Sequence, residues 1–227
     1  GDFALREACR QTAQWRASLN PDLRMAVNLS AAQFRHEGLA DRIRAVLDEF
    51  GLPGAALELE ITESVVMEDV AHGQEILKGL KRLGCRIAID DFGTGYSSLA
   101  YLKRFPVDVL KIDKSFVDGL GAESDDTAVT QAVISLARSL HLEVVAEGVE
   151  TALQLGCLTD LAGAEGYIAQ GYLFAKPMPA REFEAAYAGI EARGALAAPG
   201  VMAQESLPMF RDRREAAPVG RRPAAET

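Results

Sequence analysis

The sequence predicts an α/β protein whose parallel sheet curls into a (β/α) barrel of the TIM type. Short apolar runs alternate with helical segments six times along the chain, which is the pattern of strand-helix units. The apolar runs are almost continuous, as in parallel strands that are buried on both faces. Polar residues follow five of the six runs at nearly the same position. A barrel collects such residues at one mouth, whereas an open doubly wound sheet, the alternative, would concentrate them at one switch point.

Local signals set the boundaries of the elements in order. Apolar residues recur at helical spacing until Asn20-Pro21, which a helix cannot easily pass. Gly51 ends the next helix, and Pro179 opens the last one. The predicted strands span 24–29, 57–61, 85–90, 107–112, 142–146 and 167–172. The predicted helices span 3–19, 39–50, 69–83, 98–103, 125–140, 152–161 and 179–190.

The number of units is smaller than a complete barrel needs. A barrel of this type has eight units and typically ~250 residues, whereas about six units are expected within residues 1–194. We therefore expect residues 1–194 to form a barrel domain that lacks its first units and keeps two unpaired sheet edges. Residues 195–227 are dominated by Ala, Pro, Gly and Arg and are predicted to be a disordered tail.

Composition excludes several classes of protein. No apolar run approaches the roughly 20 residues of a membrane span, and no leader with a cleavage site opens the chain. The net charge of −9 disfavours binding to a nucleic-acid polymer, which requires a basic surface. Three cysteines without a CxxC pair predict reduced, packed thiols. We expect a cytoplasmic globular protein.

The polar residues at the strand ends form the candidate site. They are Asn28, Glu60, Asp90, Asp91, Lys111, Asp113, Glu147, Glu150 and Gln170. Oxygen ligands without histidine or thiolate suit hard cations, so Mg²⁺ or Mn²⁺ is expected and Zn²⁺ is not. The adjacent Asp90 and Asp91 could place one oxygen between two ions, an arrangement that serves phosphoryl transfer. A helix cap would explain Asp91 alone and would leave Asp90 without a role.

Lys111 has two possible roles in such a site. It could orient the attacking hydroxide or offset the charge that builds up on a phosphate. It could equally form a salt bridge that only neutralises Asp91 or Asp113. The three histidines lie in helical or loop positions and are expected at the surface.

Six motifs that contain these residues occur in order, and together they resemble the EAL domain, the bacterial cyclic-di-GMP phosphodiesterase. The resemblance covers Phe3 to about Ile190. The motifs are Asn28-Leu29-Ser30, Glu58 to Ser64, Asp90 to Leu99, Lys111-Ile112-Asp113, Glu147 to Thr151 and Gln170-Gly171-Tyr172.

The resemblance implies a barrel that uses two Mg²⁺ or Mn²⁺ ions to hydrolyse cyclic-di-GMP to linear pGpG. It assigns Asn28, Glu60 and Asp90 to one ion, and Asp90, Asp91 and Glu147 to the second. Lys111 would position the attacking water, with Lys111 and Glu147 as the catalytic pair. Asp113, Glu150 and Gln170 would support the site. Glu63 would anchor the glycine-rich loop that links metal binding to a dimer surface, so a homodimer or attachment to sensory domains is expected.

One departure from the family pattern affects the expected activity. The tripeptide Glu-Ala-Leu that names the family does not occur in the sequence. Hydrolysis by this chain alone is therefore expected to be poor or absent. Three interpretations stand: part of an active phosphodiesterase, a degenerate module that binds nucleotide or a partner without turnover, and a Mg²⁺-dependent barrel that forms enolates. The retained water-activating residues favour the first over the second, and the six ordered motifs disfavour the third.

Overall fold

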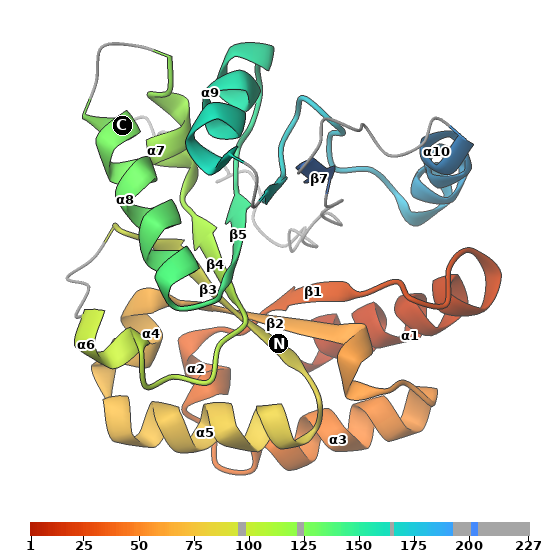
Figure 1. Ribbon diagram of the computed structural model, residues 1–227. Coiled ribbons are helices and arrows are strands. Elements are labelled where there is room, and N and C mark those ends of the chain that lie inside the picture. The colour runs from red at the N-terminus through yellow and green to blue at the C-terminus, as the bar shows by residue number, and fades with distance from the viewer. Residues whose placement is uncertain (95–98, 122–124, 164–165, 193–200, 204–227) are drawn as a thin grey trace, which may run out of the picture.

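A single parallel sheet, in which the strand order follows the chain from β1 to β7, organises the molecule (Figure 1). The computed structural model describes residues 1–94, 99–121, 125–163, 166–192 and 201–203. The strands are β1 (Met25–Asn28), β2 (Leu57–Thr62), β3 (Arg86–Phe92), β4 (Val109–Ile112), β5 (Glu143–Ala146), β6 (Tyr167–Ala169) and β7 (Val201–Ala203). Each strand pairs in parallel with the next, and the sheet curls as in a barrel, so the predicted fold class is confirmed.

Helices connect the strands and flank the curved sheet (Figure 1). The longer helices are α1 (Asp2–Ser18), α3 (Leu39–Phe50), α5 (Val70–Arg82), α8 (Asp126–Ser139), α9 (Ala152–Ala162) and α10 (Ala180–Ala192). The shorter ones are α2 (Ala31–Phe34), η1 (Gly54–Ala56), α4 (Glu63–Glu68), α6 (Leu99–Leu102) and α7 (Lys114–Asp118). All the long helices match predicted segments.

The structure adds short elements that the sequence pattern did not predict. Helices α2, α4 and α7 start within three residues of a strand end and span four to six residues, too few for a helical period to be visible. Ser30 and Asp113 cap α2 and α7 with their side-chain oxygens. Strand β7 lies within the predicted tail, while residues 193–200 and 204–227 are outside the described part, so disorder of the tail stays a prediction. Residues 95–98 of the glycine-rich loop are also outside it.

Alternate side chains along each strand face opposite sides of the sheet. The outward-facing residues, such as Leu59, Ile87 and Leu110, are buried against the helices in the large apolar core. This alternation leaves the inner face to a different set of residues, and that set contains the functional site.

The inner face has three levels along the strands. At the amino-terminal level, Arg86 Nε lies 3.1 Å from Glu58 Oε2, and the same guanidinium pairs with Glu143. The middle level is apolar and consists of Ala88, Val109 and Val145. The carboxyl-terminal level, two residues further along each strand, is charged again. Levels of this kind fill the interior of barrels, and here they separate the site from the salt bridges at the opposite end.

The first and last long helices meet beside the open sheet. The rings of Trp15 in α1 and Phe183 in α10 lie 4.3 Å apart between centroids. Trp15 Nε1 donates a hydrogen bond to Glu184 Oε1 at 2.8 Å, and Asn20 Nδ2 donates one to Tyr187 Oη at 2.8 Å. In the described residues β1 and β7 remain the two ends of the sheet, and the α1–α10 contact holds the first and last units near each other.

The cysteine and histidine predictions agree with the structure. Cys9 and Cys85 are buried free thiols, and burial raises the pKa of each to about 11. The three histidines are exposed.

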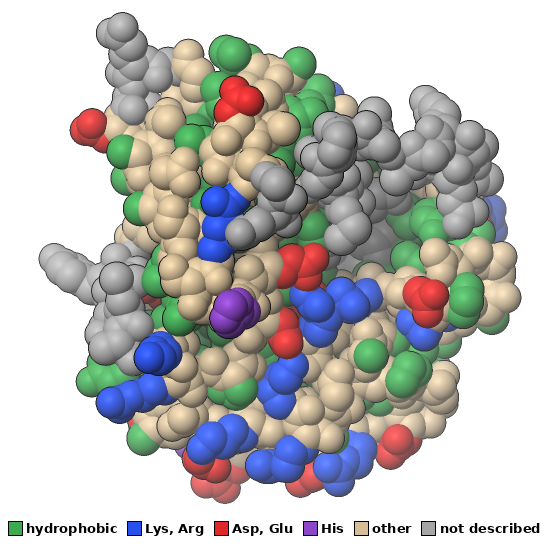
Figure 2. Space-filling view, viewed as in Figure 1, with side chains coloured by type: hydrophobic (Ala, Val, Ile, Leu, Met, Phe, Trp, Pro, Cys, Tyr) green, Lys and Arg blue, Asp and Glu red, His purple; other side chains and the backbone are tan. Residues whose placement is uncertain are grey.

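Basic and acidic side chains are intermixed on the face shown in Figure 2. Within the described ranges, no helix has the length and apolar character needed to cross a membrane.

Candidate metal and active site

Lys111 is the centre of a buried charge cluster at the carboxyl ends of the strands. Its Nζ lies 2.7 Å from Glu60 Oε1, 3.1 Å from Asp90 Oδ1 and 2.6 Å from Glu147 Oε1. The lysine side chain is only 3% exposed. The three acids come from β2, β3 and the residue after β5, so four neighbouring strands each deliver one group. The predicted salt bridge of Lys111 exists, but its partners are these three acids and not Asp91 or Asp113.

Burial and mutual charge shift the pKa values in this cluster. Burial raises the pKa of Glu60, and the nearby Lys111 offsets only part of that effect. Burial likewise raises the pKa of Glu147 to about 7. Burial alone would lower the pKa of Lys111, but the carboxylates of Glu60, Glu147 and Asp90 outweigh it and hold this pKa above its usual range. Lys111 therefore stays protonated at neutral pH.

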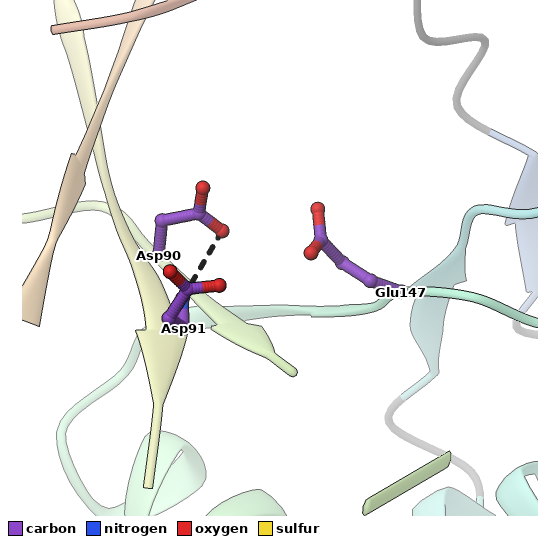
Figure 3. A group of neighbouring side chains, drawn as sticks. All are labelled: Asp90, Asp91 and Glu147. Atoms are coloured by element: carbon purple, nitrogen blue, oxygen red, sulfur yellow. Dashed lines mark hydrogen bonds between the residues drawn. The ribbon is translucent and has the colours of Figure 1, made fainter. Parts of the chain in front are cut away.

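Adjacent Asp90 and Asp91 reach the same site because the strand is irregular there. In a regular strand neighbouring side chains point to opposite faces. The pairing of β3 with β4 shifts register between Ile89 and Phe92, and Asp91 has a φ of 54°, in the left-handed region. Single carboxylate oxygens of Asp90, Asp91 and Glu147 consequently lie within 4.8 Å of one another (Figure 3). Bulges and strained residues of this kind are frequent at active sites.

The environment of Asp91 is acidic. Burial raises the pKa of its carboxyl group, and the charges of Asp90 and Asp113 raise it further. The Asp91 backbone N–H donates a hydrogen bond to Asp90 Oδ1 at 3.1 Å, drawn as a dashed line in Figure 3. Three carboxylates this close together repel one another. A divalent cation bound between them would offset that repulsion.

Glu63 lies at the start of α4 and connects β2 with the glycine-rich loop. It is 4% exposed, and its Oε2 accepts the N–H of Gly93 at 3.2 Å. Its Oε1 is buried and has no hydrogen-bond partner among the described residues. This geometry agrees with the expected anchoring of the loop that begins at Gly93.

Asn28 and Gln170 lie on either side of the charge cluster in the sheet. Asn28 is opposite Glu60 in the β1–β2 register. Gln170 follows β6, and its backbone N–H donates to Ala146 O at 2.9 Å while its carbonyl accepts from Val149 N at 3.0 Å. Both residues are thus at the carboxyl-terminal edge of the sheet, where the sequence predicted them.

Two of the predicted support residues have local structural partners. Asp113 Oδ1 accepts the N–H of Ser115 at 3.0 Å and caps α7. Glu150 is exposed and forms a salt bridge with Lys114. Asp113 remains close enough to Asp91 to affect its pKa, whereas Glu150 pairs at the surface and not with Lys111.

The sequence interpretation gave no role to two residues that hold the loops of the site, Gln154 and Gly171. Gln154 caps α9 directly after the Glu147 segment, and the Thr151-x-x-Gln154 pattern of a capping box could have indicated it. A Cβ at Gly171 would lie 2.2 Å from Val149 O, so only glycine allows these two loops to pack together. No signal in the sequence reveals the second contact, because it depends on the folded loops.

The raised pKa of Glu147 predicts a pH dependence for the metal-free protein. Between about pH 4.5 and pH 7 the folded state keeps a proton on Glu147 that the unfolded chain has lost, so stability should fall as pH rises through this window. The contribution is at most about 3.5 kcal/mol, at ~1.4 kcal/mol per pKa unit over the shift from 4.5 to about 7. Urea unfolding with a chelator should show a shallower pH slope for Glu147→Gln, and the raised pKa values of Glu60 and Asp91 should contribute to the slope that remains. The same pH slope in Glu147→Gln and in the wild type would contradict the raised pKa of Glu147.

The chain matches a known protein family along most of its length. The model of the EAL domain matches residues 1–177. A bifunctional diguanylate cyclase/cyclic di-GMP phosphodiesterase, MucR of Pseudomonas aeruginosa, is 47% identical over 188 residues, which is 83% of this chain and 27% of that protein. The cyclic di-GMP phosphodiesterase NbdA of the same organism is 43% identical, covering 81% of this chain and 23% of its own length. The chain therefore spans about a quarter of these relatives.

Solved structures show the same fold. A structure of the PaMucR phosphodiesterase in complex with c-di-GMP aligns with a TM-score of 0.76 at 47% identity, covering 81% of this chain and 73% of that one. The EAL domain of Mycobacterium smegmatis DcpA aligns with a TM-score of 0.76 at 41% identity, covering 85% of this chain and 84% of that one. From the match to the family model, the identity to these relatives and the shared half-barrel, the chain belongs to the EAL domain family.

Proposed function

We propose that this chain is part of a phosphodiesterase that hydrolyses cyclic-di-GMP to linear pGpG. The observation that carries the proposal is the convergence of Glu60, Asp90, Asp91, Lys111 and Glu147 at one mouth of the sheet. The relatives named as cyclic di-GMP phosphodiesterases support the choice of substrate. By the same kinship we propose a cytoplasmic domain that forms a homodimer or is attached to sensory or regulatory domains.

The donor atoms fit hard divalent cations. Asn28, Glu60 and Asp90 would hold one Mg²⁺ or Mn²⁺ ion, and Asp90, Asp91 and Glu147 would hold a second. Oxygen donors are what these ions prefer, and the described group of three carboxylates lies close enough together to be a candidate for holding one ion. When bound, such a pair of ions supplies a nucleophilic water at neutral pH and charge stabilisation for the leaving oxygen.

The residues of the chain have distinct tasks in this reaction. Hydrolysis adds a water oxygen to phosphorus, breaks one P–O ester bond and transfers a proton to the released hydroxyl. Lys111 keeps its proton, so it acts as a fixed positive charge that positions the water or offsets charge on the phosphate. Glu147 is the second catalytic residue of the proposal: its carboxylate would hold the second ion and lies 2.6 Å from Lys111 Nζ, so it keeps the lysine charge beside that ion.

The remaining candidates would support the site. Glu63 would fix the start of the glycine-rich loop through Gly93. Asp113 would orient Asp91 from the cap of α7, and Gln170 would line the mouth after β6. Glu150 would act indirectly, because its partner is Lys114.

The test compares residues 1–227 with a longer form that includes the residues encoded upstream of Gly1. Each is incubated with cyclic-di-GMP and Mg²⁺ or Mn²⁺, and pGpG is measured by chromatography. We expect turnover from the longer form and little or none from residues 1–227, because the Glu-Ala-Leu tripeptide is not in this sequence. Nucleotide binding without turnover by the longer form would instead identify a sensor module. Robust turnover by residues 1–227 would show that the first units are dispensable.

A further inference from the structure

The segment from Glu147 to Thr151 connects β5 with α9 and has no regular secondary structure of its own. Its first residue belongs to the site, so the path of this segment sets where the Glu147 carboxylate lies. The Glu147 N–H donates to Ile112 O at 3.1 Å, and the Val149 N–H donates to Gln170 O at 3.0 Å. These two bonds tie the beginning of the segment to the neighbouring strands.

One side chain holds the end of the segment. Gln154 Oε1 accepts two successive backbone N–H groups, from Glu150 at 2.8 Å and from Thr151 at 2.9 Å. In return, the Gln154 N–H donates to Thr151 Oγ1 at 3.2 Å. A capping box normally satisfies only the N-cap N–H with the side chain of the third helical residue. The additional bond to Glu150 extends the cap back into the loop that carries Glu147.

Gln154 is well placed to act as a rigid support. It is 7% exposed, so its carbonyl oxygen has little competition from water. The loop beside it is closely packed: Gly148 has a φ of 70°, and a Cβ there would lie 2.3 Å from Lys114 Cγ. A shift of Glu150 and Thr151 would therefore be transmitted along the loop and not absorbed by free space.

We propose that Gln154 is a positioning residue for Glu147 in metal binding, and this inference rests on the proposed function. Its side-chain carbonyl fixes the backbone of the segment so that the Glu147 carboxylate meets those of Asp90 and Asp91. Mg²⁺ requires ligand distances near 2.0–2.1 Å in an almost ideal octahedron. A small displacement of the loop therefore lowers the affinity for the ion more than it lowers the stability of the protein.

The test uses the full chain and measures Mn²⁺ affinity by isothermal titration calorimetry. Gln154→Met keeps the length of the side chain but removes the acceptor, and it should weaken Mn²⁺ binding by about 10- to 100-fold. Gln154→Glu keeps an acceptor at the same position, because Glu and Gln serve equally in a capping box, and it should restore the wild-type affinity. Amide hydrogen exchange at Glu150 and Thr151 should accelerate in Gln154→Met and return to normal in Gln154→Glu.

Thr159→Val is the matched control in the same helix. The Thr159 hydroxyl bonds to Leu155 O at 2.8 Å and to Tyr167 Oη at 3.1 Å, away from the Glu147 segment. This substitution should lower the stability of the protein and leave Mn²⁺ affinity unchanged. If Gln154→Met does not unfold cooperatively, Gln154→Asn, whose carbonyl is one methylene shorter, replaces it with the same expectation.

The possible outcomes separate this inference from the proposed function. Wild-type affinity in Gln154→Met, even with faster amide exchange, would overturn the positioning role. Equal losses in Gln154→Met and Thr159→Val, or no rescue by Gln154→Glu, would also overturn it. A wild-type chain that binds no Mn²⁺ would overturn the metal site itself and the positioning role with it.

Discussion

Replacing Asp90 with asparagine is expected to lower cyclic-di-GMP hydrolysis by at least about 100-fold, the loss typical of removing one group that stabilises transition-state charge. Asp90 is the one carboxylate that the proposal assigns to both ions, so its substitution should weaken the binding of both. The fold should persist. The asparagine carbonyl can still accept the Asp91 N–H, and Lys111 retains Glu60 and Glu147 as partners.

The measurement is pGpG release by the longer form of the protein at saturating Mg²⁺, with unfolding followed in parallel. Asp41→Asn is the matched control, because this carboxylate is 81% exposed on α3 and far along the chain from the charge cluster. It should hydrolyse at the wild-type rate. Turnover that survives in Asp90→Asn would remove the assignment of a shared metal ligand at this position.

Replacing Lys111 with methionine is expected to destabilise the metal-free protein by about 3–5 kcal/mol, as for a buried ion pair that loses one partner. Methionine has a similar length but leaves three carboxylates without their cation. The side chains of Glu60 and Asp90 are only 8% and 12% exposed, so water can solvate their unpaired carboxylates only poorly. Hydrolysis should be lost as well, because no other side chain contacts all three acids in the described cluster.

The loss of stability should depend on pH in a defined direction. Without Lys111 the folded-state pKa values of Glu60 and Glu147 rise further, so protonation of the folded state recovers stability as pH falls. Urea unfolding with a chelator should therefore show a larger difference from wild type near pH 8 than near pH 5.5. Lys114→Met, which removes an exposed lysine paired with Glu150, serves as the control and should change stability little. An equal loss at both pH values would mean that packing, and not charge, is what Lys111 contributes.

Much of the fold could be predicted because its signals are local. The apolar runs that became β1 to β6 are recognisable without any tertiary contact, and Asn20-Pro21, Gly51 and Pro179 mark helix boundaries through their own backbone preferences. The strand-end acids were also visible in the sequence. Parallel strands present their carboxyl ends at one edge, so Glu60, Asp90 and Lys111 were expected to meet and do meet.

The inner face of the sheet was not predicted correctly at its amino-terminal level. The sequence interpretation treated the strands as almost continuously apolar. In the structure, the inner face carries the charged residues Glu58, Arg86 and Glu143. These charges are tolerated only because the register places them beside one another, and a register is a property of paired strands. The short helices α2, α4 and α7 escaped prediction for a related reason. Side-chain caps stabilise α2 and α7, and the buried residues of α4 pack against the rest of the protein, so no periodic pattern marks these helices.

By itself the sequence determined the order of the elements, the half-barrel and the set of acids, because backbone propensity and the alternation of apolar segments are carried by neighbouring residues. Tertiary structure alone decided how those acids are used. The register shift at β3 and the left-handed Asp91 turn two adjacent aspartates toward one point. Lys111 forms salt bridges with Glu60, Asp90 and Glu147. Gln154 accepts a hydrogen bond from the loop that follows Glu147. Such choices depend on distances of a few ångströms between separate strands, which no local pattern encodes.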